Sequence, residues 1–381
     1  MPGSYANLAV QQNLNKKGRM EYKIPLDQSA FYPHETVLVE GAGLSASTFV
    51  YPSGVKAVRL RHQNADVIML PYQGQQIWSA VFSGRQLAMR SMFSEPQAER
   101  DVLRNLARFL LHCGVTGIGA PGPQDRHVLH GELPNAPYQH AWLVVGEDES
   151  GSYFGLSGSY EYIEAFNSHY RFTPLVKLYQ GSTLLHTTVI LENLNQTPLE
   201  YMYLAHVNFR PVDYGRLVYS ARVNPANVRV RANLPPNLQA RPGYKEFIQQ
   251  LVQHPELHHE LKPGMSYDPE VVFYINFIAD DQGWASSMQV HPDGSADIVR
   301  HKPQQLSHGV RWICRTANQE ALGFEPATAE VEGFSAEKAK GNVNVLAAGA
   351  VFRAEYQLGL LNSERAEEER VKISALTGIT W

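Results

Sequence analysis

The chain has 381 residues, of which 44 % are apolar and 18 % are charged, with 29 glycines and 23 prolines. This composition excludes a disordered chain, a coiled coil and a collagen-like repeat. The 33 basic and 37 acidic side chains leave a net charge of −4, which is too small and of the wrong sign to attract nucleic acid or anionic lipid. We therefore expect a neutral or small polar ligand.

Sequence features also bear on where the protein resides. No apolar run reaches the roughly 18 residues that indicate a membrane span, and the polar segment 1–17 lacks the features of a secretory signal. We therefore expect a cytoplasmic protein that binds no membrane. Cys113 and Cys314 lie far apart in the sequence, which favours two free thiols over a disulfide.

The N-terminal segment 1–50 contains two stretches that read as extended, residues 22–26 and 36–39. We predict that this segment forms an arm or extra strands packed on a main domain of residues 51–381. No repeat of fixed period and no Ser/Gly-rich or charged linker divides that remainder, so it is expected to be a single structural unit.

The first half of the main domain predicts one helix and two strands. Ser94 and Gln97 resemble a capping box at the start of an apolar stripe, which predicts a helix within residues 94–113. Residues 185–191 and 199–209 are rich in β-formers. The turn between them contains Asn and Pro, which predicts a hairpin-like reversal.

The second half continues in the same way. An amphipathic pattern predicts a helix over residues 244–253, and a short helical turn is expected at 335–340. Residues 271–278 are almost continuously apolar and read as a buried strand, while strict alternation over 352–360 indicates a half-buried strand. The fold class that follows is all-β, with a large antiparallel β-sandwich and a few short helices.

Several familiar sites are absent from the sequence: a Gly-rich phosphate loop, a nucleophile elbow, paired CxxC motifs and HExxH. His254, His258 and His259 cluster at the end of a predicted helix. No cysteine or carboxylate pattern beyond Glu260 completes a metal site there, so we predict no metal ligand.

His206 is the clearest isolated polar residue in an apolar strand. With a period of two it shares a face with Met202 and Leu204, and Asn208 follows on that face. One interpretation is a core histidine bonded to a backbone carbonyl. The other is a group for proton transfer, because an imidazole titrates near neutral pH.

Three further residues have the chemistry of a site. His130 precedes a glycine that permits close backbone approach, although alone it reads as a loop histidine. Asp268 lies at the start of a buried strand, where a carboxylate can simply close a turn. Glu325 lies between Phe324 and Pro326, and apolar surroundings raise the pKa of a carboxyl group and improve it as a general base.

These residues belong to an ordered series of short motifs. The series is His130-Gly131, then an Asn193-x-x-x-Thr197-Pro198 turn before a strand with His206-x-x-Phe209, then Tyr267-Asp268-x-x-x-x-Phe273, then Phe324-Glu325-Pro326. In order and spacing it resembles the aldose 1-epimerase (galactose mutarotase) superfamily over about residues 50 to 361. The resemblance implies a galactose mutarotase-like supersandwich.

The resemblance also implies roles for four residues. His206 would be the general acid that protonates the ring oxygen of a sugar, and Glu325 the general base that takes the anomeric hydroxyl proton. His130 would help to stabilise charge at the ring oxygen, and Asp268 would hold sugar hydroxyls. Interconverting two anomers requires one acid and one base, and no metal or redox cofactor is called for.

The chain departs from the family pattern at the arginine that normally precedes the His-Gly motif. We expect Arg90, or alternatively Arg85, to take its place as a substrate-binding residue. Asn208 is a further candidate contact. Trp142 and Tyr214 are candidate aromatic walls, because sugar C–H faces pack on aromatic planes, although both are equally explained as core or rim residues.

The leading hypothesis is a carbohydrate mutarotase that is free of cofactors and acts on a small sugar, with neither nucleic acid nor a membrane as partner. Two alternatives remain: a non-catalytic carbohydrate-binding or regulatory protein, and a metal-dependent sugar isomerase that uses the clustered histidines. The sequence specifies neither the sugar nor the oligomeric state.

Overall fold

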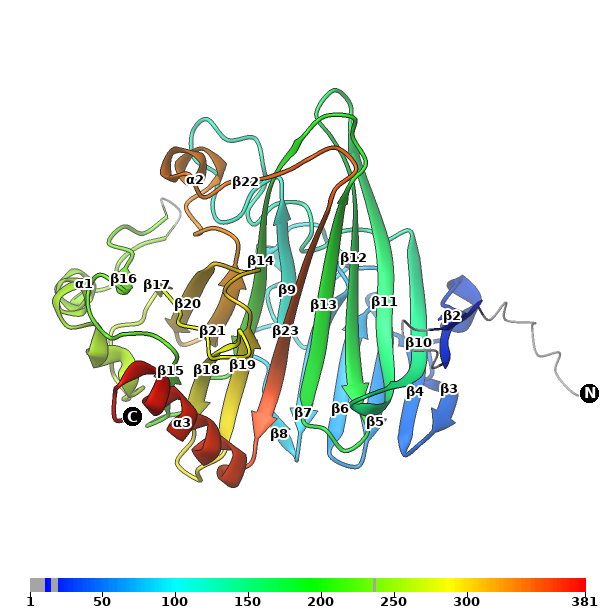
Figure 1. Cartoon of the computed structure of the whole chain (residues 1–381), viewed down its shortest axis with the longest axis horizontal. Helices are drawn as coiled ribbons and strands as arrows, with labels where there is room; N and C mark the ends of the chain where they lie inside the picture. The colour runs from blue at the N-terminus through cyan, green and yellow to red at the C-terminus, as the bar shows by residue number, and fades with distance from the viewer. Residues whose placement is uncertain (1–10, 15–19, 236–237) are drawn as a thin grey trace, which may run out of the picture.

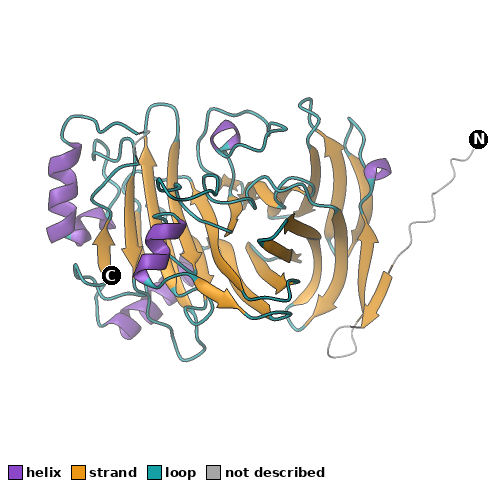
Figure 2. Cartoon of the chain, turned by 90° about the horizontal axis from the view of Figure 1, so that it is seen from above, coloured by secondary structure: helices purple, strands orange, loops and turns teal. Residues whose placement is uncertain are grey.

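A computed structural model describes residues 11–14, 20–235 and 238–381. Over these residues the chain forms two large antiparallel sheets that face each other (Figure 1). Seen from above, the longer helices lie toward one end of the sheets and the N-terminal strands at the other (Figure 2). The all-β sandwich predicted from the sequence is confirmed.

The first sheet has ten strands. From edge to edge they are β1 (Gln11–Leu14), β2 (Met20–Pro25), β10 (His140–Asp148), β11 (Gly151–Glu164), β12 (Ser168–Tyr179), β13 (Leu184–Asn193), β23 (Val351–Leu361), β19 (Ala296–His301), β18 (Ala285–Val290) and β15 (Arg216–Tyr219).

The second sheet has thirteen strands. Its order is β16 (Val228–Val230), β17 (Val271–Ile275), β20 (His308–Arg315), β21 (Glu320–Ala327), β14 (Leu199–Phe209), β9 (Leu110–Val115), β7 (Gln76–Phe82), β6 (Ala65–Leu70), β5 (Lys56–His62), β4 (Leu44–Val50) and β3 (Thr36–Gly41). Two short strands join at the side, with β22 (Asn344–Leu346) on β14 and β8 (Arg85–Gln86) on β7.

Alternating side chains fill the space between the sheets. In β12, for example, Tyr170, Phe172, Pro174, Val176 and Leu178 are buried, while the residues that alternate with them are half-exposed. The N-terminal strands extend both sheets, because β2 joins the first sheet and β3 and β4 join the second. The extended stretches predicted within residues 1–50 are therefore present in this described part of the chain.

Two of the three predicted helices are confirmed, as α1 (Tyr244–Gln253) and α2 (Phe334–Lys340). The helix predicted within residues 94–113 is wrong. That segment contains only a short 3₁₀ turn, Leu103–Asn105, before β9 begins. The buried Asn105 side chain bonds to the backbone of residue 97 and turns the chain, and β9 is buried on both faces, so its apolar residues serve a central strand.

The predicted hairpin between β13 and β14 is also wrong, because the two strands belong to different sheets. The turn between them carries the chain from one sheet to the other. The buried Asn193 amide fixes this crossing by donating to the carbonyls of Thr197 and Leu346, both at 2.9 Å.

The remaining predictions near the C-terminus need one addition. The predicted strands within 271–278 and 352–360 are confirmed as β17 and β23, the former ending at Ile275. A further helix, α3 (Ser363–Thr377), was not predicted.

Cys113 and Cys314 are both free and buried. None of the described helices is long and apolar enough to span a membrane.

Candidate functional site

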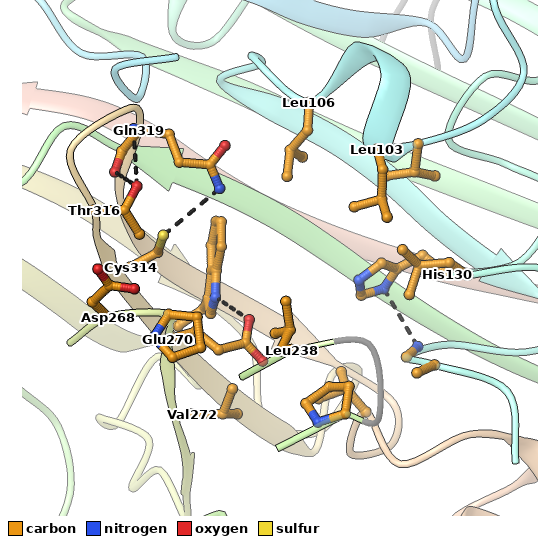
Figure 3. A pocket seen from close by; sticks show the side chains of 18 of the residues that line it. Leu103, Leu106, His130, Leu238, Asp268, Glu270, Val272, Cys314, Thr316 and Gln319 are labelled. Atoms are coloured by element: carbon orange, nitrogen blue, oxygen red, sulfur yellow. Dashed lines mark hydrogen bonds between the residues drawn. The ribbon is translucent and has the colours of Figure 1, made fainter. Parts of the chain in front are cut away.

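A cavity of about 560 Å³ lies on the face of the thirteen-stranded sheet that points away from the ten-stranded sheet, and Figure 3 shows side chains of its lining. Alternation along β14 explains why polar groups reach it. Tyr203, Ala205 and Val207 pack in the core between the sheets, whereas Leu204 packs in a second apolar cluster that contains Trp312. His206 lies in phase with Leu204 and so lines the cavity.

Neighbouring strands bring Glu325 to the same level. In the ladder between β14 and β21, the pairs Leu204–Ala327 and Asn208–Gly323 flank the position where His206 and Glu325 lie opposite each other. His206 Nδ1 is 3.1 Å from Glu325 Oε1, and both side chains are almost fully buried. Two groups separated by 119 positions thus form one contact on the cavity floor.

Burial controls the protonation of this pair. Desolvation lowers the pKa of His206 well below its ordinary value, with a contribution from His130, while Asn208 opposes the shift. Desolvation also raises the pKa of Glu325, the negative charge of Glu270 adds to the rise, and Arg231 opposes it. Burial therefore favours the uncharged form of both members of the pair, with the proton on Glu325 and not on His206.

His130 lies at the edge of the same cavity, with its ring centroid 5.2 Å from that of His206. Its backbone is left-handed, with φ of 61°, and Gly119 N–H donates to its Nδ1 at 3.3 Å. The ring proton is thereby assigned to Nε2. Burial, together with the charges of His127 and Arg231, lowers the pKa of His130 to about 4, so this side chain is a neutral N–H donor.

Three cavity residues were not singled out from the sequence. Trp312 stands with its ring edge-on to His206, at a centroid distance of 5.5 Å, and its Nε1–H donates to Glu270 at 2.8 Å. Arg231 makes a second, short contact with the same carboxylate. The Glu270 charge is thus held in place beside Glu325 by two donors.

Asp268 also lines the cavity, nearer to its mouth, where Arg241 lies 3.4 Å from its carboxylate. His130, His206, Asp268 and Glu325 therefore share one cavity, and Figure 3 labels His130 and Asp268 among them. Two positive and two negative side chains flank the neutral pair, Arg231 and Arg241 against Asp268 and Glu270, so the charges balance.

The other predicted contact residues lie outside the cavity lining. The Arg90 guanidinium is committed to Glu320 at 3.0 Å and to the carbonyls of Thr316 and Ala317, so it supports a turn that lines the cavity rather than the cavity itself. Asn208 is buried behind His206 and donates to the Arg108 carbonyl.

The two predicted aromatic walls are also elsewhere. Trp142 belongs to β10, in the other sheet, and stacks on His140. Tyr214 is 58 % exposed in a loop after β14. Among the cavity-lining residues Trp312 offers an aromatic plane. It lies in the cavity wall, the place that the sequence predicted for Trp142.

The histidine cluster after α1 has a structural role. His258 is buried, contacts the Pro255 carbonyl and accepts from Arg311 at 2.7 Å, with Phe273 stacked on its ring. Across the described part of the chain, no three His, Cys, Asp or Glu side chains are arranged to hold a metal ion.

Comparison with known proteins places the chain in a family. The model described as "Domain of unknown function (DUF4432)" matches residues 52–360. The chain belongs to this family. A comparison with curated proteins found no significant match. The DUF4432 match spans His130, His206, Asp268 and Glu325.

Solved structures define the fold of this DUF4432 member. A crystal structure described as a "putative aldose 1-epimerase" from Klebsiella pneumoniae superposes with a TM-score of 0.81 at 16 % identity, covering 96 % of this chain and 97 % of that chain. A galactose mutarotase-like protein from Clostridium acetobutylicum gives a TM-score of 0.55 at 12 % identity, covering 84 % and 100 %. The fold is that of the galactose mutarotase-like proteins.

The residues that were missed carry a weak sequence signal. Val310, Trp312 and Cys314 alternate with charged or apolar neighbours in β20, and all three line the cavity. Asp268 and Glu270 both precede β17 and both line the cavity, but they lie outside the strand, so alternation does not relate them. The alternation in β20 indicates that Val310, Trp312 and Cys314 share one face of a strand. The sequence does not show that this face lies near His206, because that depends on how the strands pair, as Val272 does with Trp312.

Proposed function

We propose that this protein interconverts the anomers of a free sugar by acid–base catalysis between His206 and Glu325. The observation that carries the proposal is the 3.1 Å contact between these two groups on the floor of a cavity. The two oxygens that exchange protons in this reaction, the ring oxygen and the anomeric hydroxyl oxygen, are bonded to the same carbon. Two side chains that contact each other can therefore reach both oxygens and exchange a proton with each.

The protonation state of the pair fits this chemistry. A neutral Glu325 carboxyl and a neutral His206 imidazole hold the same number of protons as a carboxylate and an imidazolium. Glu325 gives its proton to the ring oxygen as the bond from the anomeric carbon to that oxygen breaks. His206 takes the anomeric hydroxyl proton, which leaves an open-chain aldehyde. After rotation about one bond, ring closure runs in reverse on the other face and returns both protons.

This assignment exchanges the acid and base roles that the family resemblance implies. Its reason is burial, which favours the uncharged form of each group and so leaves the proton on the carboxyl at rest. The neutral Nε2–H of His130 can donate to the ring oxygen. Trp312 supplies an apolar plane for C–H groups, and Asp268 and Glu270 can accept from sugar hydroxyls.

Kinetics of two isosteric variants test the proposal. Glu325→Gln and His206→Asn each remove one proton-transfer group, and we expect each to slow mutarotation by about 100-fold or more. Polarimetry on a freshly dissolved pure anomer measures the rate, and thermal unfolding checks that both variants fold. Glu256→Gln, an exposed carboxylate outside the cavity lining, is the matched control and should keep the wild-type rate.

A non-catalytic sugar-binding protein makes the opposite prediction. In that case calorimetry would detect sugar binding to the wild-type protein, while the mutarotation rate would equal that of buffer and would not respond to either variant.

A further inference from the structure

A second hollow of about 790 Å³ opens on the same side of the thirteen-stranded sheet as the cavity. We call it the outer hollow. Its lining is rich in amide and charged side chains and includes one tyrosine, with principal members Arg229, Asn233, Tyr274, Asn276, His308 and Lys340. Arg231 lines both the cavity and the outer hollow.

Strand alternation shows that the two spaces are consecutive along one face. The register pairs Val272 with Trp312 and Tyr274 with Val310 across β17 and β20. Val272, Trp312 and Val310 line the cavity, whereas Tyr274, and then His308 one alternation further along β20, line the outer hollow. Each such step advances about 7 Å along a strand, which is close to the length of one sugar ring.

The outer hollow lies beside the reacting pair. Val310 pairs with Tyr274 on one side and with Glu325 on the other, so these residues occupy one row across β17, β20 and β21. A ligand that has its reactive carbon at Glu325 can therefore extend along the sheet face, past Arg231, toward Tyr274 and His308.

The charged side chains of the outer hollow have polar partners in the hollow or beside it, and Arg231 is paired with Glu270 of the cavity. Glu330 contacts both Arg229 and Lys340, the latter at 2.8 Å, and the Tyr274 hydroxyl donates to Glu332. Paired charges and amides offer hydrogen bonds to hydroxyl groups without a net attraction for an anion. The chemistry therefore favours a neutral glycosyl unit over a phosphate.

We propose that the preferred substrate is a reducing saccharide of more than one unit, with its reducing-end ring in the cavity and the adjoining sugar unit in the outer hollow. This inference rests on the proposed function for the chemistry at the reducing end. It adds the class of substrate, because a monosaccharide would leave the outer hollow unused.

A bulky substitution in the outer hollow tests the inference. Ala336 lies on α2 and lines this hollow, whereas Ala339 is exposed on the same helix and lines neither space. We expect Ala336→Trp to weaken binding of a reducing disaccharide by about tenfold while leaving monosaccharide binding unchanged. Ala339→Trp, the matched control, should change neither. His308→Ala is a second, smaller change that should lower disaccharide affinity in the same selective way.

Calorimetry with a reducing disaccharide, its component monosaccharide and a hexose phosphate decides the question without reference to catalysis. Tighter binding of the disaccharide by the wild-type protein, lost in Ala336→Trp, supports the outer hollow as a glycosyl site. Equal affinities for the disaccharide and the monosaccharide, or tightest binding of the phosphate, would overturn it. If the disaccharide binds selectively but no sugar shows faster mutarotation, the proposed function fails and the binding site stands.

Discussion

Glu270 and Glu325 occupy one cavity but meet different surroundings. Glu270 accepts from Trp312 and contacts Arg231, whereas buried Glu325 Oε1 has His206 Nδ1 at 3.1 Å and no further polar partner. The charge of the first raises the pKa of the second. Glu270 is thus a positioning residue whose charge helps to keep the proton on Glu325.

Removing that charge should shift the pH dependence of the reaction. In Glu270→Gln the pKa of Glu325 falls, because a nearby negative charge is lost and Arg231 is released from it. If the reacting form carries a protonated Glu325, the alkaline limb of the pH–rate profile moves down by about one pH unit. Rates measured from pH 5 to 10 check this, with Glu256→Gln as the control. A limb that stays in place or moves upward contradicts the role of Glu270.

The buried carboxyl should also limit stability. The pKa of Glu325 is raised above its ordinary 4.5 in the folded state, so its contribution to stability is full below pH 4.5 and is lost as pH rises through the folded pKa. Gln cannot ionise, so Glu325→Gln should unfold about 2 °C or more above wild type at pH 8, with the difference shrinking toward pH 5. A variant less stable than wild type at pH 8 would contradict this, as measured by calorimetric Tm.

At the scale of residues, the sequence pointed to His130, His206, Asp268 and Glu325, which the structure brings to one cavity. Each lies beside a local signal, a glycine, a strand face or a proline. Trp312 and Glu270 were missed because their importance depends on contacts between distant segments. Nothing local to Trp312 distinguishes it from Trp142, which packs in the other sheet.

At the scale of elements, α2 and the loop that carries His130 are joined by one carboxylate. Asp125 accepts from the backbone N–H of Ser335 at 2.9 Å, in the first turn of α2, and from Gly122 N–H at 2.8 Å. His127, two residues later, accepts from Phe334 N–H at 3.2 Å. We call these hydrogen bonds of Asp125 and His127 the junction. The loop that carries His130, and with it the edge of the cavity, is held in place by this junction.

Replacing Asp125 should loosen that edge. We expect Asp125→Ala to cost about 1 kcal/mol and to speed hydrogen exchange of the Gly119 amide, which donates to His130. Asn362→Ala removes the N-cap of α3, where the side chain accepts from Arg365 N–H, and should cost a similar amount without changing exchange at Gly119. If the Gly119 amide exchanged at the same rate in both variants, the proposed role of the junction in holding the cavity edge would be contradicted.

Elements that are determined by nearby residues were predictable from the sequence. Elements that are determined by pairing with distant segments were not. The helix α2 ends at Gly341, whose φ of 79° suits glycine, and α1 has a clear amphipathic face. The segment before β9 carries a helix-like stripe, yet its last residues pair with β14 in the middle of a sheet. The charged helix α3 buries few side chains, among them Ala366 and Ile373, and so lacks an apolar stripe.

At the scale of the whole molecule, the two sheets interleave early and late parts of the chain. In chain order, the first sheet takes strands from β1 to β23 and the second takes strands from β3 to β22, and each contains strands from the N-terminal segment. The proposed catalytic pair, His206 and Glu325, depends on this arrangement, because the second sheet places β14 and β21 side by side. The boundary between an N-terminal arm and a main domain, placed at residue 50, stays a prediction.

The low net charge of the whole chain corresponds to the way charges are arranged in the cavity and the outer hollow. The cavity and the outer hollow both contain charged side chains, but these are paired with one another. A net charge of −4 therefore accompanies two hollows without a strong field of either sign, which suits the neutral sugar that we propose as ligand.

Saturation-transfer NMR on the wild-type protein tests the central claim most directly, since it reports exchange between two anomers at equilibrium. Irradiating the anomeric proton of one anomer should reduce the signal of the other, at a rate that rises in proportion to protein concentration for at least one reducing sugar in a panel of mono- and disaccharides. An exchange rate equal to that of buffer for every sugar in the panel, including any that calorimetry shows to bind, would contradict the account.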